Sequence, residues 1–272
     1  MGSINAVTFG VFFKPIAGDF DWSRGAMSGS YAVRSVVCAA FAPVVGYLSD
    51  RYGPRWVLLA CSALFAICFL ALARIDALWQ LYLVQGLFMG MASSGPFVCL
   101  TSTVAKWHTT RRGLALGIAS AGYGLSSIIF PPLATALIQA IRWQGALTVL
   151  GILMAIIAVP ASLMLRDPPR PSGPPASSPA PQRGPFQGLR MLLELARSRE
   201  FMAVVLMVFF LYFAYSLVPS HLVNYATDIG IGVVAAAAML SVMGAMNTAG
   251  RFAMGHLSDL FGSRVAMVTS SA

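Results

Sequence analysis

Arg251 and Asn247 are the residues of this sequence whose types and spacing best suit the binding of an anion. Four positions separate them within a long apolar run, so in a helix both side chains project from one face. A guanidinium group there could bind a carboxylate through two parallel hydrogen bonds, with the Asn247 amide beside it. The alternative is that Arg251 reaches the polar end of its helix, about 6 Å away along the axis.

Four other polar side chains in or near apolar runs are candidates for the same kind of site. Arg34 lies deep in its run, and it either lines a central cavity or pairs with a helix dipole or backbone carbonyls. Lys14 lies near the end of its run and is better explained as an interfacial lysine. His221 could gate a path or take up a proton, and a structural role at the interface is the alternative. Tyr123 could reach the cavity, although the glycines and serines around it indicate close helix packing first.

Residues arranged for catalysis or metal binding are missing from the sequence. It contains no nucleophile and base pair, no phosphate-binding glycine loop and no cluster with metal-ligand spacing, which argues against an enzyme, a metal site and a bound cofactor. The cysteines lie in apolar runs and are interpreted as small buried side chains. All nine carboxylates map to loops or helix ends, so we predict no acidic proton relay within the helices.

The elements that must position these side chains are membrane-spanning helices. Apolar residues make up 58% of the 272 residues and charged residues only 10%, and the mean hydropathy is +0.76. A soluble surface cannot be built from this composition. Apolar runs of roughly 17 to 25 residues have the length that crosses a bilayer. We predict eight such helices and the start of a ninth, at residues 4–18, 26–48, 56–73, 79–105, 113–140, 144–165, 200–223, 232–254 and from 264.

Basic residues lie mainly on one side of this predicted arrangement. Only Arg24, Arg74 and Arg142 fall in one set of alternating loops, and most other basic residues fall in the opposite set. Because topology follows the count of Lys and Arg, we predict that the richer side is cytoplasmic, together with the N-terminus. The net charge of +9 is explained by anionic lipid headgroups, and no nucleic-acid surface is indicated.

A proline-rich segment divides the chain. It contains the run PPRPSGPPASSPAPQRGP, whose composition cannot bury a core. We therefore predict an N-terminal bundle of helices 1 to 6 at residues 1–165, a cytoplasmic linker at 166–199, and a partial C-terminal bundle at 200–272.

One decapeptide occurs twice, at the end of the second and of the eighth predicted helix. The first copy is GYLSDRYGPR and the second is GHLSDLFGSR, with six of ten positions identical. Two copies in matching places indicate two homologous halves. Their glycines suit tight turns and close helix approach, and their Asp and Arg residues form a charge cluster at the membrane border. The residues concerned are Gly46, Asp50, Arg51, Gly53 and Arg55 in the first copy, and Gly255, Asp259, Gly262 and Arg264 in the second.

The first decapeptide resembles the signature loop of the major facilitator superfamily. Three longer segments resemble the bacterial branch of the monocarboxylate transporter and oxalate:formate antiporter families: FGVFFKPIAGDFDWSRGAMSGSY (9–31), KWHTTRRGLALGIASAGYG (106–124) and NTAGRFAMGHLSD (247–259). The resemblance implies an all-α membrane fold of twelve helices in two six-helix bundles around one central site. This chain is shorter, and we interpret it as a fragment that lacks the start of helix 1 and helices 9–12.

The resemblance also implies roles for particular residues. Monocarboxylate transporters carry a substrate-binding Arg at the position matching Arg251, and an acidic residue or Asn at the one matching Asn247. By analogy with the intact superfamily, Asp259 should approach the N-terminus of the fifth predicted helix near Arg112 and Gly113, as a gate between the bundles.

The function expected from these residues and this resemblance is secondary active transport of a small organic anion by alternating access. The substrate would be a mono- or dicarboxylate, the surrounding partner membrane lipid, and the coupled species either protons or a counter-anion. The location would be the inner membrane of a bacterial cell. A carrier for another substrate, such as a sugar or a drug, and a non-transporting fragment are the alternatives.

Overall fold

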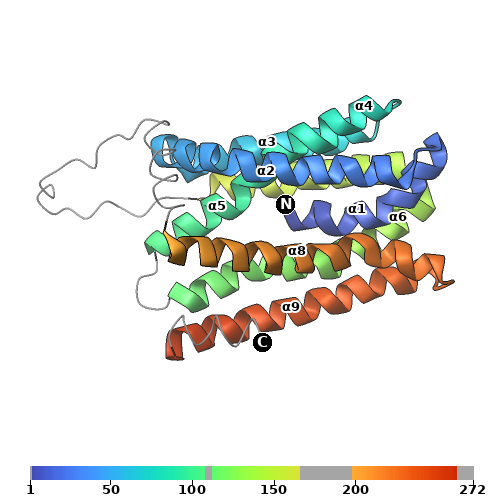
Figure 1. Cartoon of the computed structure of the whole chain (residues 1–272). Helices are drawn as coiled ribbons and strands as arrows, with labels where there is room; N and C mark the ends of the chain where they lie inside the picture. The colour runs from blue at the N-terminus through green and yellow to red at the C-terminus, as the bar shows by residue number, and fades with distance from the viewer. Residues whose placement is uncertain (1, 108–111, 166–197, 262–272) are drawn as a thin grey trace, which may run out of the picture. The chain divides into compact units, whose positions relative to one another are not determined.

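The computed structural model describes residues 2–107, 112–165 and 198–261, and every regular element in these ranges is helical (Figure 1). The chain divides into two compact units, residues 1–167 with 219–272 and residues 168–218. The larger unit holds every candidate side chain that the sequence predicts and the structure describes. Most of the predicted linker lies outside the described residues, so the division into two bundles stays a prediction.

Every apolar run predicted as a helix within the described residues is helical. The long helices are α1 (Gly2–Phe20), α2 (Arg24–Tyr52), α3 (Pro54–Leu72), α5 (Met89–Trp107), α6 (Arg112–Leu163), α8 (Arg199–Asp228) and α9 (Val233–Phe261). The short helix α4 (Leu78–Leu81) and the π-helix η1 (Tyr82–Phe88) lead directly into α5. Two predicted helices form the halves of α6, separated by non-helical backbone at Ile141 and Arg142. The start of the predicted ninth helix lies outside the described residues.

The connections between helices follow from local chemistry. Ser23 caps α2, because its hydroxyl accepts a hydrogen bond from the Ala26 backbone N–H at 3.2 Å. Gly53 ends α2 and precedes α3 with φ 86°, a conformation that glycine adopts without steric cost. Gly230 makes the turn between α8 and α9 with φ 89°.

Five described helices are long and apolar enough to cross a membrane: residues 24–52, 54–72, 78–104, 113–163 and 233–254. Helix α1 is not among them, because Asn5, Lys14 and Asp19 lower its hydropathy. Large apolar side chains such as Val36 and Ile156 are exposed along these helices. A surface of this kind suits lipid, and the chain is a multi-pass membrane protein.

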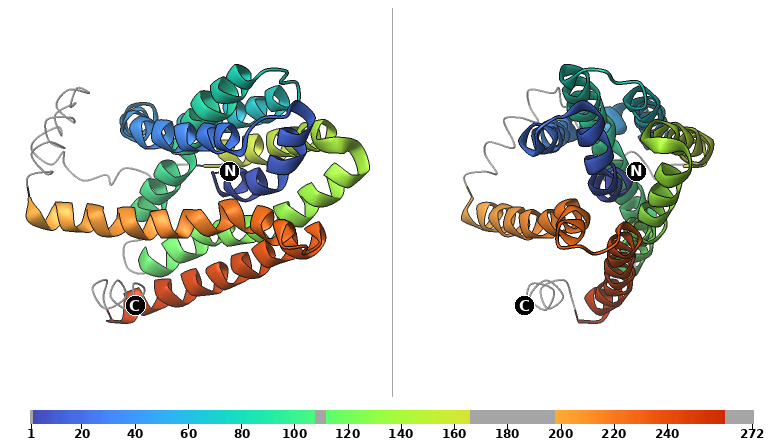
Figure 2. Two further views of the ribbon diagram at one scale, coloured as in Figure 1. Left: turned by 45° about the vertical axis from the view of Figure 1, so that its right-hand side comes forward. Right: turned by 90° about the vertical axis from the view of Figure 1, so that its right-hand side faces the viewer.

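Within the larger unit, α2 packs on α5 and η1, and α3 packs on α5 and α6. The buried core between them contains Phe65, Phe69, Met89 and Leu150. Helix α9 lies along the first half of α6, as the views in Figures 1 and 2 show. This contact between α6 and α9 brings residues from distant parts of the sequence together.

Candidate anion-binding site

Small residues allow α6 and α9 to approach each other closely. A Cβ atom added at Gly124 would contact the Thr248 hydroxyl and would lie 2.6 Å from the Gly244 carbonyl oxygen. The Ser241 hydroxyl of α9 donates a hydrogen bond to the Ile128 carbonyl oxygen of α6 at 2.9 Å. Close backbone approach through small residues is a common means of packing helices in membranes. It places the residues next to Gly124 and Thr248, namely Tyr123 and Asn247, at the same contact.

Arg251, Asn247 and Tyr123 lie together at this contact between α6 and α9. The Arg251 Nε donates a hydrogen bond to Asn247 Oδ1 at 2.8 Å. The Arg251 Cζ lies 5.3 Å from the centroid of the Tyr123 ring. The amide and the ring therefore hold the guanidinium from two sides, since an aromatic face attracts a cation.

The Arg251 guanidinium retains most of its hydrogen-bonding capacity. It has five N–H donors, of which only the one on Nε is used by Asn247. None of the ion pairs among the described residues includes Arg251. The two terminal amino groups can therefore bind a carboxylate in the bidentate manner that guanidinium groups favour.

Tyr123 connects this cluster to α5. Its ring meets the ring of Phe97 edge to face, with centroids 6.2 Å apart and an interplanar angle of 81°. This geometry is favourable for aromatic pairs. The aromatic pair thus joins the cluster around Arg251 to α5.

Arg34, the predicted intramembrane cation of α2, contacts helix α5. Its Nη1 donates to the Ser93 hydroxyl at 3.3 Å, and its Cζ lies 4.7 Å from the centroid of the Tyr31 ring. Among the described residues no backbone carbonyl accepts a hydrogen bond from Arg34, and the lining of a central cavity by Arg34 stays a prediction. The contacts of Arg34 are with a hydroxyl and an aromatic face.

The comparison with protein families matches the profile of the Major Facilitator Superfamily to residues 1–272. This chain belongs to the major facilitator superfamily. Among its relatives, monocarboxylate transporter 13 of Bos taurus is 30% identical over 264 residues, which cover 95% of this chain and 58% of the relative. Monocarboxylate transporter 11 of Homo sapiens is 30% identical over 263 residues, covering 94% and 54%. The oxalate:formate antiporter of Oxalobacter formigenes is 26% identical over 161 residues, covering 58% and 38%.

The superfamily is one of transporters rather than of enzymes. The chain spans between half and three fifths of the length of the two monocarboxylate transporters that it matches. The names of all three relatives refer to carboxylates.

The first copy of the superfamily signature loop, residues 46–55, lies entirely within the described residues. The Gly53 N–H donates to the Ser49 carbonyl oxygen at 3.0 Å and closes α2. Arg51 Nη1 donates to the Tyr47 hydroxyl at 3.0 Å. Arg55 packs over Trp56, and its Nε is buried without a partner. The turn predicted from the glycines is therefore made by Gly53.

The remaining residues of the first signature loop do not take part in the turn. Gly46 lies within α2 with open space beside its Cα, so neither a turn nor a close contact explains it. Asp50 is exposed and belongs to none of the ion pairs among the described residues.

The second signature loop is only partly described. Gly255 and Asp259 lie within α9, which continues to Phe261, beyond the predicted end of the eighth helix. Gly262 and Arg264 lie outside the described residues. Helix α6 begins at Arg112 with Gly113 next to it. The contact between Asp259 and this helix end stays a prediction.

His221 is not part of the cluster around Arg251. It lies on α8 with an exposed side chain, and no described contact joins it to Arg251 or Arg34. A gating role for His221 stays a prediction.

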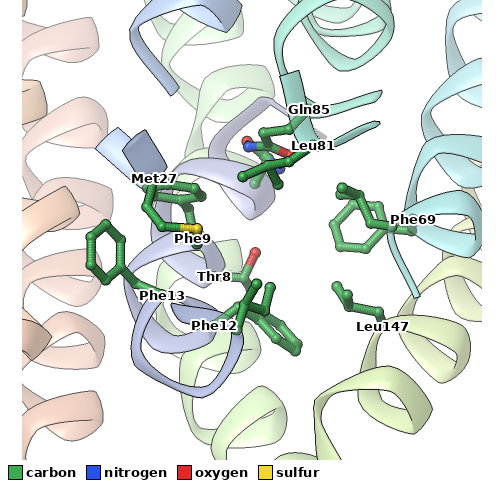
Figure 3. A pocket seen from close by; sticks show the side chains of 12 residues that line it. Thr8, Phe9, Phe12, Phe13, Met27, Phe69, Leu81, Gln85 and Leu147 are labelled. Atoms are coloured by element: carbon green, nitrogen blue, oxygen red, sulfur yellow. The ribbon is translucent and has the colours of Figure 1, made fainter. Parts of the chain in front are cut away.

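A buried pair of amides was not predicted from the sequence. Asn5 Nδ2 donates to Gln85 Oε1 at 3.3 Å, and Gln85 Nε2 donates to Asn5 Oδ1 at 3.0 Å. Both side chains face a cavity of about 30 Å³ that Thr8, Phe12 and other side chains line (Figure 3). Gln85 lies in η1, and π-helical turns occur frequently at functional sites. The only signal in the sequence was an amide within each of two apolar runs.

A cluster of charges at one end of the bundle was also missed. Lys14 Nζ lies 2.6 Å from Asp228 Oδ1, and Arg24 Nη1 lies 2.9 Å from Asp228 Oδ2. These hydrogen bonds, first from Lys14 and then from Arg24, lower the pKa of Asp228. Lys14 therefore has a specific partner, in addition to its predicted interfacial position.

Proposed function

We propose that the protein is a secondary transporter of small organic anions and that Arg251 binds the carboxylate group of its substrate. The proposal rests on the contacts of the Arg251 guanidinium. Asn247 and Tyr123 orient it, while no carboxylate of the described chain pairs with it. A positioned, unpaired guanidinium inside a membrane protein is suited to bind an anion that comes from outside.

The geometry favours a carboxylate over a neutral ligand. Two terminal N–H groups lie in the plane of the guanidinium and match the two oxygens of a carboxylate. The remaining Asn247 amide N–H groups can donate a further hydrogen bond, because Asn247 Oδ1 already accepts from Arg251. A carboxylate loses its hydration when it enters an apolar region, and these donors would replace that water.

Alternating access between two homologous halves would carry the anion across. The repeated decapeptides support two halves, with the first six helices in one and α8 and α9 in the other. In this proposal the protein lies in the inner membrane of a bacterial cell, surrounded by lipid, with its N-terminus and the linker at 166–199 in the cytoplasm.

The positions of the acidic groups bear on which species, a proton or a second anion, moves together with the substrate. The described carboxylates are found in loops or in the first or last turns of helices: Asp19, Asp21, Asp50, Asp76, Glu200, Asp228 and Asp259. No described helix carries an acidic group in its centre that could pass a proton. We therefore propose that a proton crosses on the substrate itself or that a counter-anion moves in exchange.

Uptake into proteoliposomes tests the proposal. The complete product of the gene is reconstituted and supplied with radiolabelled lactate, pyruvate, formate or oxalate, with and without a pH gradient. We expect saturable uptake of at least one acid, and we expect Arg251→Gln to reduce it by at least about a hundredfold, because a charged hydrogen bond pair is lost. A pH gradient that drives uptake indicates proton coupling, whereas stimulation by an internal anion indicates exchange.

Arg74→Gln is the matched control, since it removes an exposed Arg at the end of α3 and should leave uptake unchanged. Uptake that Arg251→Gln does not alter would contradict the role of Arg251. A protein that takes up none of the four acids would instead carry another class of substrate, such as a sugar or a drug.

A further inference from the structure

Arg34 is a buried cation whose charge is not neutralised by the described part of the chain. Its side chain is 8% exposed, and its Nε has no hydrogen-bond partner among residues 2–107, 112–165 and 198–261. Its single hydrogen bond, to the uncharged Ser93 hydroxyl, is long at 3.3 Å. None of the ion pairs of the described residues includes Arg34.

An arrangement of this kind is costly for the protein alone. A guanidinium keeps its proton at any physiological pH, so Arg34 cannot avoid the cost of burial by becoming neutral. The Tyr31 ring, 4.7 Å away, compensates only in part because a ring face is a weak partner for a charge. An anion supplied from outside the chain would satisfy both the charge and the unused donors.

Arg34 and the site around Arg251 both contact helix α5, at residues one turn apart. Ser93, the partner of Arg34, precedes Phe97 by four residues in α5, so the two side chains lie one turn apart on the same face. Phe97 contacts the Tyr123 ring, which in turn faces the Arg251 guanidinium. Arg34 thus contacts α5 at Ser93, and the aromatic partner of Arg251 contacts α5 one turn further on, at Phe97.

We propose that Arg34 is a second anion-binding residue on the substrate path, and that it binds the second carboxylate of a dicarboxylate. The inference rests on the proposed function and narrows its substrate class. Arg251 on α9 would bind one carboxylate, and Arg34 on α2 the other, in succession during transport. A monocarboxylate would use Arg251 alone.

The first test compares two acids of equal carbon number in the reconstituted complete protein. We expect Arg34→Gln to raise the KM for malonate by at least about tenfold, as the loss of one charge-assisted pair implies, and to change the KM for propionate less than about twofold. Arg34→Lys keeps the charge and should retain most of the affinity for malonate. Arg74→Gln again serves as the control for the loss of an exposed charge.

The second test measures binding without transport, through a thiol beside Arg34. Cys38 lies four residues after Arg34 in α2 and is half-buried, whereas Cys61, Cys68 and Cys99 are buried. Cys38 is therefore the thiol that should react first with N-ethylmaleimide. We expect malonate to slow its labelling several-fold, and we expect uncharged malonamide to have no effect. In Arg34→Gln, malonate should no longer slow the labelling of Cys38.

The outcomes separate this inference from the proposed function. Unchanged KM values in Arg34→Gln, together with equal labelling of Cys38 with and without malonate, would overturn the inference. An equal rise in KM for both acids would also overturn it, because Arg34 would then not distinguish a dicarboxylate from a monocarboxylate. If the protein takes up none of the acids, the proposed function fails, while protection of Cys38 by malonate still decides the role of Arg34. Should Arg34→Gln not fold, the comparison of malonate with malonamide on the unaltered chain gives the decision.

Discussion

Single side chains in this protein show how a charge is stabilised by its surroundings. Arg251 and Arg34 each face an aromatic ring and one polar side chain, and both retain unused donors. Lys14 and Arg24, in contrast, share the carboxylate of Asp228. The first two cations are therefore suited to an external anion, and the other two are suited to hold helix ends together.

Asp228 should make the stability of the protein depend on pH in the acidic range. Its pKa is lowered in the folded state by hydrogen bonds from Lys14 and then from Arg24. Its contribution is therefore complete above the ordinary pKa of Asp, about 3.9, and is lost as the pH falls through the lowered value. We expect Asp228→Asn to reduce the unfolding temperature equally at pH 7 and pH 5, and the difference to shrink below about pH 4. Thermal unfolding in detergent measures this.

Asp76→Asn provides the comparison for this experiment. Asp76 is an exposed carboxylate in the loop after α3 and has no ion pair in the described structure, so its replacement should have little effect at any of these pH values. A difference for Asp228→Asn that already disappears between pH 7 and pH 5 would contradict the lowered pKa.

Helices α6 and α9 depend on small residues for their close contact. We expect Gly124→Ala to lower the unfolding temperature, because its Cβ would meet the Thr248 side chain and the Gly244 carbonyl oxygen, and inserting atoms into such a contact costs about 1–3 kcal/mol. Thermal unfolding in detergent measures the change. Carboxylate uptake should fall with it, because Tyr123 and Asn247 are held at this contact.

Gly122→Ala is a close control for this substitution. Gly122 lies on the same helix two residues earlier, and a Cβ there would have open space around it. If both alanine variants lower the unfolding temperature equally, the effect reflects glycine in general rather than the contact between α6 and α9.

Hydrophobic length and helix-breaking residues made the helices predictable, but not the contacts between them. The apolar runs located each helix, and even the break at Ile141 and Arg142 fell between two predicted spans. The spacing of Asn247 and Arg251 predicted their shared face, because both belong to one helix. The partners Asn5 and Gln85 are 80 residues apart, so no local pattern could pair them.

The charge cluster around Asp228 and the π-helix could not be predicted from the sequence, for related reasons. Lys14 and Asp228 are separated by 214 residues, and only the folded chain brings them together. The π-helix η1 has the same apolar composition as its α-helical neighbours, so hydrophobic periodicity does not distinguish it. Tyr123 was recognised as a candidate, but its contact with Arg251 depends on the close packing of α6 against α9.

At the scale of the whole molecule, the two signature loops should control which side of the membrane the substrate site faces. We expect Asp259→Lys to weaken closure on the cytoplasmic side, because the N-terminus of α6 with Arg112 favours an anion and would repel a lysine. The measurement is the labelling rate of a cysteine substituted for Ser102 of α5, with a membrane-impermeant reagent added from the cytoplasmic side. This rate should rise in Asp259→Lys.

The matched variant is Asp76→Lys, which makes the same charge change in the loop between α3 and α4. It should leave the labelling rate unaltered. An unchanged rate in Asp259→Lys would count against the gate between the second signature loop and α6.

The π-helix has a consequence for how this chain can change in evolution. A π-turn accommodates one residue more than an α-turn, so η1 behaves as a single-residue insertion within a span that otherwise continues from Leu78 to Trp107. Removing one residue there would restore an α-helix and rotate everything before it by about 100° relative to α5. Ser93 and Phe97 would keep their places, while Gln85 would turn away from Asn5. A change of one residue in η1 therefore changes the orientation of α4 relative to α5 without altering α5 itself.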